Sequence, residues 1–216
     1  MNGKLTTSEM QDLKTEVEYR TNLQEICNKI YAALNLDEII INLKDEIMGL
    51  FAAERMTIYY VDGVRREIVS RFKSGDEISE IRVPISPTSI AGYSVHTKQL
   101  VNIAEVYDKA ELHRIDPLLE FDSSWDRKTG FRTTQVLVVP IVYKTFLLGA
   151  VQLINKKGGT VFTKAEESYV TELAKIMGIA MYNQKRMAKT RSGKFDHLLE
   201  NHIMTQKELN TAIADA

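Results

Sequence analysis

Residues 135–167, QVLVVPIVYKTFLLGAVQLINKKGGTVFTKAEE, decide the fold of this chain. Residues 135–143 and 146–155 are two apolar runs with a tight turn between them, and this pattern predicts a hairpin of buried strands. Thr163 is followed three residues later by Glu166, a capping box in which hydroxyl and carboxylate each satisfy one backbone N–H at a helix start. The stretch therefore predicts two adjacent antiparallel strands that lead directly into a long helix.

The chain before this stretch changes from helical to strand periodicity. Apolar side chains at helical spacing predict two amphipathic helices, over residues 7–34 and 39–50. Apolar and polar residues then alternate over 56–62, 67–72 and 81–85, which predicts three strands, and the Asp62-Gly63 dipeptide predicts a hairpin turn between the first two.

The middle of the chain is less regular. A short helix is expected from Thr88 or Ser89 to about His96, followed by the strand-like QLVNI at 99–103, and residues 104–132 are then rich in charge. A connection of this length inside a compact domain is usually functional or partly helical. We therefore expect an α+β fold, with one antiparallel sheet of five to six strands, helices on one face and a ligand-sized lid region on the other.

Four acidic residues fall within this lid region, and we interpret them as solvated loop residues. Nothing apolar in the sequence around them would shift a pKa toward general acid or base chemistry. These residues are Glu111, Glu120, Asp122 and Asp126.

The overall composition excludes several classes of function. The chain has 28 basic and 29 acidic residues, which are interspersed, so no strong positive field exists to attract nucleic acid. The longest aliphatic run, residues 136–142, is too short to cross a bilayer, and the amino end lacks the apolar core of a signal peptide. We expect a cytoplasmic domain with no nucleic-acid partner and no membrane insertion. The single Cys27 lies on the apolar face of a predicted helix and is interpreted as a packed thiol.

The ends of the chain look like additions to one core. Residues 1–20 form an N-terminal helical extension in which Met10, Leu13 and Val17 make a narrow apolar stripe. The stripe fits either pairing with a second copy or a solvent-exposed helix. Residues 188–194 are expected to form a linker, and residues 195–216 the truncated helical start of a following domain.

Three sequence strings resemble the GAF family over residues 21–187: EISEIRVPISPTSIAGYSVHTKQLVNI at 77–103, TGFRTTQVLVVPI at 129–141 and LLGAVQLINKKGGTVFTKAEE at 147–167. The motif is similar to that of the regulatory GAF domains of cyclic-nucleotide phosphodiesterases. The resemblance implies a GAF-like (profilin-like) fold. The motif positions are Asn155, Lys156, Phe162, Glu166 and Glu167, with Glu166 in place of the family's Asp. We expect Lys156 to meet a carboxylate at the start of the last helix and to brace strand against helix.

The resemblance also implies a binding site under the lid for a small-molecule effector, including a cyclic nucleotide. The matching candidate positions are Thr57, Phe72, Lys73, Ile90, Ala91, Thr129, Thr133 and Gln152. Lys73 and Gln152 stand where relatives carry acids, which changes how a purine would be recognised. The alternative for each position is an ordinary core or turn residue.

Enzymatic chemistry is not expected. One branch of the family reduces free methionine sulfoxide with several cysteines, and this chain has only Cys27. His96 and His113 have no supporting metal-ligand spacing, and His197 and His202 would not share one helix face. No metal and no cofactor are required for the function that we expect.

We therefore expect a regulatory sensor that relays to a C-terminal effector domain. Over a short stretch the tail resembles the start of the N-terminal domain of type II secretion and type IV pilus assembly ATPases. The alternative is a ligand-free dimerisation and interaction module, in which helices 7–34 and 163–190 form a bundle across a two-fold axis.

Overall fold

The computed structural model of the protein describes residues 6–33, 43–74 and 77–191. Six strands form one sheet in the order β3-β2-β1-β6-β5-β4, and every neighbouring pair is antiparallel. The strands are β1 (Ala53–Asp62), β2 (Glu67–Ser74), β3 (Glu77–Pro84), β4 (Val101–Ile103), β5 (Val136–Tyr143) and β6 (Phe146–Lys156). The predicted α+β class and the predicted antiparallel sheet are confirmed.

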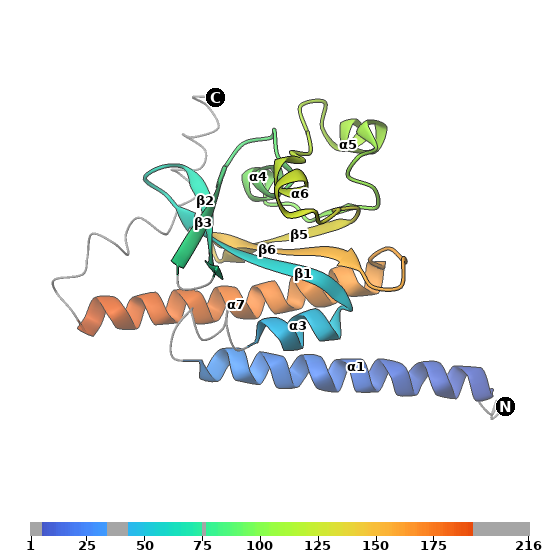
Figure 1. Ribbon diagram of the computed structural model, residues 1–216. Coiled ribbons are helices and arrows are strands. Elements are labelled where there is room, and N and C mark those ends of the chain that lie inside the picture. The colour runs from blue at the N-terminus through green and yellow to red at the C-terminus, as the bar shows by residue number, and fades with distance from the viewer. Residues whose placement is uncertain (1–5, 34–42, 75–76, 192–216) are drawn as a thin grey trace.

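The helices lie on both faces of the sheet (Figure 1). One layer holds α1 (Thr7–Ala32), α3 (Lys44–Leu50) and α7 (Lys164–Arg191). The other face carries α4 (Ile90–Thr97), α5 (Lys109–Ile115) and α6 (Ser124–Thr129). The lid region 104–132 therefore includes two short helices, and it lies on the side of the sheet away from α1 and α7.

Side chains alternate across the sheet and so make two separate cores. On β1, Met56 and Ile58 pack with the layer of α1, α3 and α7, whereas Tyr59 and Val61 pack with α4 and the lid. This alternation is the period of two that any strand imposes on its side chains. We call these the helix-side core and the lid-side core. Three lid residues, Val106, Leu112 and Leu119, are buried in the lid-side core.

α1 is continuous across the expected boundary at residue 20. It begins with a capping box between Thr6 and Glu9, and its first buried core residue is Leu23. It runs parallel to α7, because the ring of Tyr19 lies 4.6 Å from that of Tyr169, and Gln184 at the other end of α7 donates to the carbonyl of Ala33. The helix therefore connects the predicted extension to the domain core without a break.

Cys27 lies on the core-facing side of α1 and is only 1% exposed, as expected of a packed thiol. Burial raises the pKa of this thiol to about 11, so the thiol stays protonated at neutral pH.

Two expected boundaries differ from the structure. The second predicted helix, 39–50, appears as α3 from Lys44, and its earlier part lies outside the described residues. α7 continues to Arg191, so residues 188–191, expected to begin a linker, are helical. Basic residues near the end of a helix do not by themselves stop it. Between residues 178 and 193 the sequence contains no Gly or Pro that would end the helix. Residues 192–216, with the expected truncated domain, lie outside the described residues.

Candidate functional site

Thr57 and Gln152 lie directly opposite each other in the middle of the sheet. Thr57 on β1 is the register partner of Gln152 on β6, and Gln152 is in turn the partner of Val138 on β5. Val138 belongs to the lid-side core, and side chains of register partners share a face, so this row faces the lid. Thr57 and Gln152 are both half-buried. The structure thus brings together two expected polar positions from distant parts of the chain.

Ile90 and Ala91 open α4 on the same face of the sheet. Ser89 caps this helix, since its hydroxyl accepts a hydrogen bond from the N–H of Gly92 at 3.2 Å. The side chains of Ile90 and Ala91 are buried in the lid-side core, so the polar groups that these two residues contribute are those of the backbone. The first N–H groups of a helix have no acceptor within the helix and so suit an anion.

Gly92 fixes the position of this helix start. A Cβ at Gly92 would lie 2.4 Å from the carbonyl oxygen of Pro84, so the helix passes closer to the end of β3 than any side chain would allow. The start of α4 is therefore held against the sheet by backbone packing.

The two candidate threonines beside the lid already have partners in the protein. The hydroxyl of Thr129 donates to the carbonyl of Trp125 at 2.8 Å within α6. Thr133 is 6% exposed and binds the carboxylate of Asp126 through both its N–H (2.7 Å) and its hydroxyl (2.8 Å). Because both hydroxyls already donate within the protein, they could only accept a hydrogen bond from a ligand. Thr133 is better described as the anchor of the lid's carboxyl end.

Phe72 and Lys73 lie near the end of β2, where their backbones pair with Ser79 and Ile78 of β3. Their side chains lie outside the described part of the structure, so their expected stacking and charge roles stay predictions.

Two of the lid acids, Glu111 and Asp122, accept hydrogen bonds within the lid. Glu111 accepts from the N–H groups of Ala104 and Glu105. Asp122 accepts from Ser124, and this side-chain hydrogen bond lowers the pKa of the carboxyl. These acids therefore stabilise turns of the lid, in addition to the contact with solvent that the sequence predicts for loop residues.

Asp126 has a larger role, because it is shared between Thr133 and Tyr107. The hydroxyl of Tyr107 donates to Asp126 at 2.9 Å, and this hydrogen bond raises the pKa of the phenol. Asp126 therefore ties the beginning and the end of the lid to α6.

Asn155 at the end of β6 holds the carboxyl end of the lid against the sheet. Its Oδ1 accepts from the N–H and hydroxyl of Thr134 (2.8 and 3.0 Å) and from the N–H of Gln135 (3.1 Å). Its Nδ2 donates to Glu54 (2.9 Å) and to the carbonyl of Arg132 (2.8 Å). With a φ of 50°, Asn155 adopts the left-handed conformation that Asn tolerates better than most residues.

The next residue, Lys156, connects this strand end to α7. Its Nζ lies 2.7 Å from both carboxylate oxygens of Glu166, and both side chains are largely buried. Glu166 also accepts from the N–H and hydroxyl of Thr163. The expected contact of Lys156 with a carboxylate at the helix start and the expected capping box are both present.

Glu167 and Phe162 complete the junction from the side of β4. Asn102 donates from Nδ2 to Glu167 at 2.8 Å and to the carbonyl of Phe162 at 2.9 Å. Phe162 itself is 3% exposed and belongs to the helix-side core. These residues border a hollow of about 370 Å³. All five motif residues therefore serve the junction between sheet, lid and α7.

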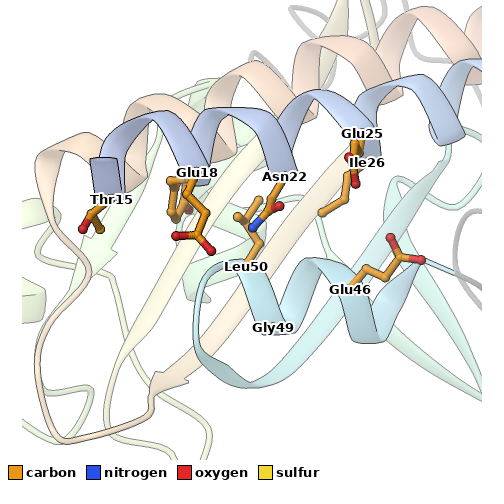
Figure 2. A pocket seen from close by; sticks show the side chains of 9 residues that line it. Thr15, Glu18, Asn22, Glu25, Ile26, Glu46, Gly49 and Leu50 are labelled. Atoms are coloured by element: carbon orange, nitrogen blue, oxygen red, sulfur yellow. The ribbon is translucent and has the colours of Figure 1, made fainter. Parts of the chain in front are cut away.

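A larger hollow of about 410 Å³ lies between α1 and α3, on the other side of the sheet from the expected site (Figure 2). Glu18, Glu25 and Glu46 line it, and Lys29 binds Glu46 at 2.7 Å. None of the residues that line this hollow is among the expected ligand positions.

Arg55 and Phe131 are absent from the expected site residues, although they form a contact between the sheet and the end of the lid. The guanidinium carbon of Arg55 on β1 lies 3.6 Å from the ring centroid of Phe131. Phe131 belongs to the quoted TGFRT string, but no spacing rule joins it to a residue 76 positions earlier. Only the three-dimensional structure brings this pair together.

Within residues 6–33, 43–74 and 77–191, no helix combines the length and the apolar character that crossing a bilayer requires. In the same part of the chain, His, Cys, Asp and Glu side chains form no group of three or more that could hold a metal ion.

The sheet between a helix layer and a lid, with an Asn-Lys and Glu-Glu junction, defines the sensor-type α+β domain known as GAF. The chain belongs to the GAF domain family, whose model matches residues 19–181. Among curated proteins it is similar to a probable 3',5'-cyclic phosphodiesterase (pde-5) of Caenorhabditis elegans, with 29% identity over 73% of this chain and 22% of that protein. The chain thus spans about a fifth of the length of this relative.

Solved structures agree with this fold. The GAF domain of a phosphoenolpyruvate-protein phosphotransferase from Coxiella burnetii aligns with a TM-score of 0.64 and 16% identity, covering 79% of this chain and 96% of the other. The free methionine-R-sulfoxide reductase of Neisseria meningitidis aligns with a TM-score of 0.60 and 16% identity, covering 78% and 91%. At such identities the likeness concerns the fold alone.

Proposed function

We propose that this chain is a regulatory sensor domain that binds a small molecule between the sheet and the lid, and relays binding through α7 to a C-terminal effector. One observation carries the proposal: two adjacent residues join the lid to α7. Asn155 binds Arg132, Thr134 and Gln135 at the end of the lid, and Lys156 binds Glu166 in the first turn of α7. A ligand that shifts the lid would therefore act on the start of α7 through a continuous set of hydrogen bonds.

The binding site that we propose is the row of Thr57 and Gln152 together with the start of α4. The two side chains offer hydrogen-bond partners to a planar polar group, and the N–H of Ala91 in the first turn of α4 suits an acceptor atom of the ligand. A cyclic nucleotide is the ligand class that the phosphodiesterase relative favours. Lys73 and Gln152 replace acids in the family pattern, so we expect base selectivity to differ from that of relatives.

We assign no catalytic activity to the chain and no required cofactor. The structurally similar reductase acts on methionine sulfoxide, and that chemistry uses cysteines. Cys27 is the only cysteine here, and it is buried in the helix-side core, on the other side of the sheet from the lid. A cytoplasmic location and an effector of the secretion or pilus ATPase type remain part of the proposal, supported by the sequence alone.

The exposed stripe on α1 favours a second function, dimerisation. Met10, Leu13 and Val17 are 50%, 49% and 63% exposed, on a part of α1 that precedes its first buried residue. Apolar side chains at this spacing are typical of a helix seam. A homodimer through the N-terminal and C-terminal helices would be compatible with a sensor and would also suffice for a pure interaction module.

A thermal-shift experiment separates sensor from scaffold. We would measure the melting temperature of the chain against cyclic mononucleotides, cyclic dinucleotides and a panel of metabolites, since a ligand that binds only the folded state raises it saturably. The double variant Thr57→Ala/Gln152→Ala should weaken binding at least tenfold. The matched control Thr21→Ala/Gln24→Ala, on exposed positions of α1, should not.

No saturable shift with any compound would reject the sensor proposal. A dimer in light scattering that Val17→Glu converts to monomer would then support the interaction module.

A further inference from the structure

Arg55 presents a cation on the lid face of the sheet. On β1 it lies two residues before Thr57, and its register partner is Ile154 of β6, whose side chain packs against the lid-side core. Side chains two residues apart on a strand point the same way and lie about 7 Å apart. The guanidinium of Arg55 therefore lies beside the proposed binding row.

The guanidinium of Arg55 has no hydrogen-bond partner within residues 6–33, 43–74 and 77–191. Among the residues that the structure describes, Arg55 makes no hydrogen bond and no ion pair, and its one specific contact is the face of Phe131 at 3.6 Å. Stacking on a ring leaves the five in-plane N–H donors of an arginine free to bind a carboxylate or phosphate.

Two acidic residues close in sequence to Arg55 and Phe131 have other partners. Glu54, the neighbour of Arg55 on β1, accepts a hydrogen bond from Asn155, and Asp126 in α6 is occupied by Thr133 and Tyr107. Neither carboxylate forms an ion pair with Arg55 in the described part of the chain.

Phe131 is held in place over Arg55 by its neighbours in the chain. Gly130 ends α6 in the left-handed conformation, with a φ of 69°, and turns the chain toward the sheet. Arg132 and Thr133 are then fixed by Asn155 and Asp126. The ring is therefore a fixed stacking surface that orients the guanidinium before any ligand arrives.

We propose that Arg55 is the residue that recognises the acidic group of the ligand, so that the small molecule sensed by this domain is an anion with a carboxylate or phosphate. The inference rests on the proposed function and names its ligand class. The fork of the guanidinium binds two oxygens of the anion, and Phe131 keeps the fork in one plane. The rest of the ligand extends over Thr57 and Gln152.

The experiment uses simple anions as probes. Melting temperatures of the whole chain are measured in rising inorganic phosphate or succinate, against chloride at equal ionic strength, for wild type, Arg55→Gln, Arg55→Lys and Arg20→Gln. Arg20 is the matched control, because its guanidinium also lies over a ring, that of Tyr169 at 5.6 Å, but on the helix side of the sheet. The phosphate and succinate arms tell which of the two groups the site prefers.

We expect a saturable rise in wild type and in Arg20→Gln, and an apparent affinity at least tenfold weaker in Arg55→Gln. Arg55→Lys keeps the charge and the fold but loses the planar fork, so it should fall between them. An unchanged response in Arg55→Gln, or no response to either anion in wild type, would overturn the inference.

The metabolite panel distinguishes this inference from the proposed function. A neutral compound that raises the melting temperature equally in wild type and Arg55→Gln would keep the sensor and refute the anion. An Arg55-dependent response to phosphate or succinate with no response to any panel compound would keep the anion site and refute the sensor.

Discussion

Asn155 gives the sharpest test of how the lid is attached. Asn155→Ala removes the acceptor of the Thr134 and Gln135 N–H groups and the donor to the Arg132 carbonyl. A buried polar group left without a partner costs about 1–3 kcal/mol. Gln135 is buried, Thr134 is half-buried and Arg132 is exposed, so we take about 1 kcal/mol for each of the two amides and nothing for the carbonyl.

The backbone of Asn155 adds a second cost that a control variant isolates. At a φ of 50°, an alanine is strained by roughly 1 kcal/mol relative to glycine. Asn155→Ala should therefore lower the free energy of unfolding by about 3 kcal/mol, and Asn155→Gly by about 2 kcal/mol.

Urea unfolding followed by circular dichroism measures both values by linear extrapolation. Hydrogen exchange adds a local reading, because the amides of residues 134 and 135 should lose protection in both variants. Wild-type stability in Asn155→Gly would refute the reasoning, since the hydrogen bonds would then contribute nothing. So would a loss below 1 kcal/mol in Asn155→Ala.

Three further predictions concern Tyr19, Cys27 and Gly149. Tyr19→Phe should raise the free energy of unfolding by about 1 kcal/mol, because the Tyr19 hydroxyl is buried without a hydrogen-bond partner in the described part of the chain; a clear loss in urea unfolding would show that it has one. Cys27, with its thiol pKa raised by burial to about 11, should resist iodoacetamide at pH 8 until the protein unfolds, and rapid labelling of native protein would contradict this. Gly149→Ala should destabilise by about 2–3 kcal/mol, because its Cβ would lie 1.9 Å from the carbonyl oxygen of Tyr59. Gly178→Ala, whose Cβ would meet its nearest atom at 3.1 Å, should cost clearly less, and equal losses would refute the packing argument.

The strands and caps could be predicted from the sequence because each depends on neighbouring residues. The alternation at Met56, Ile58 and Tyr60, the turn after Asp62 and the Thr163–Glu166 capping box need only local rules, and all appear in the structure. The pairing of Lys156 with Glu166 also followed, since both lie at the ends of one short loop.

The attachment of the lid could not be predicted in the same way. Asn155 meets Thr134 from 21 residues away and Glu54 from 101 residues away, and such contacts depend on strand register. Asp126 looked like a loop acid because its partner Thr133 is reached only after the chain turns at Gly130. Sequence periodicity says which face a side chain takes, but it does not say which polar groups meet there.

The division of the interior into two cores has a consequence for how the domain would come apart. Val106, Leu112 and Leu119 contribute to the lid-side core alone, whereas Leu23, Ile30 and Leu173 contribute only to the other. The sheet acts as a partition, so the lid can detach as a local unfolding unit while α1, α3 and α7 remain docked. Under mild denaturant the amides of residues 104–132 should exchange well before those of α7, and proteases should cut there first.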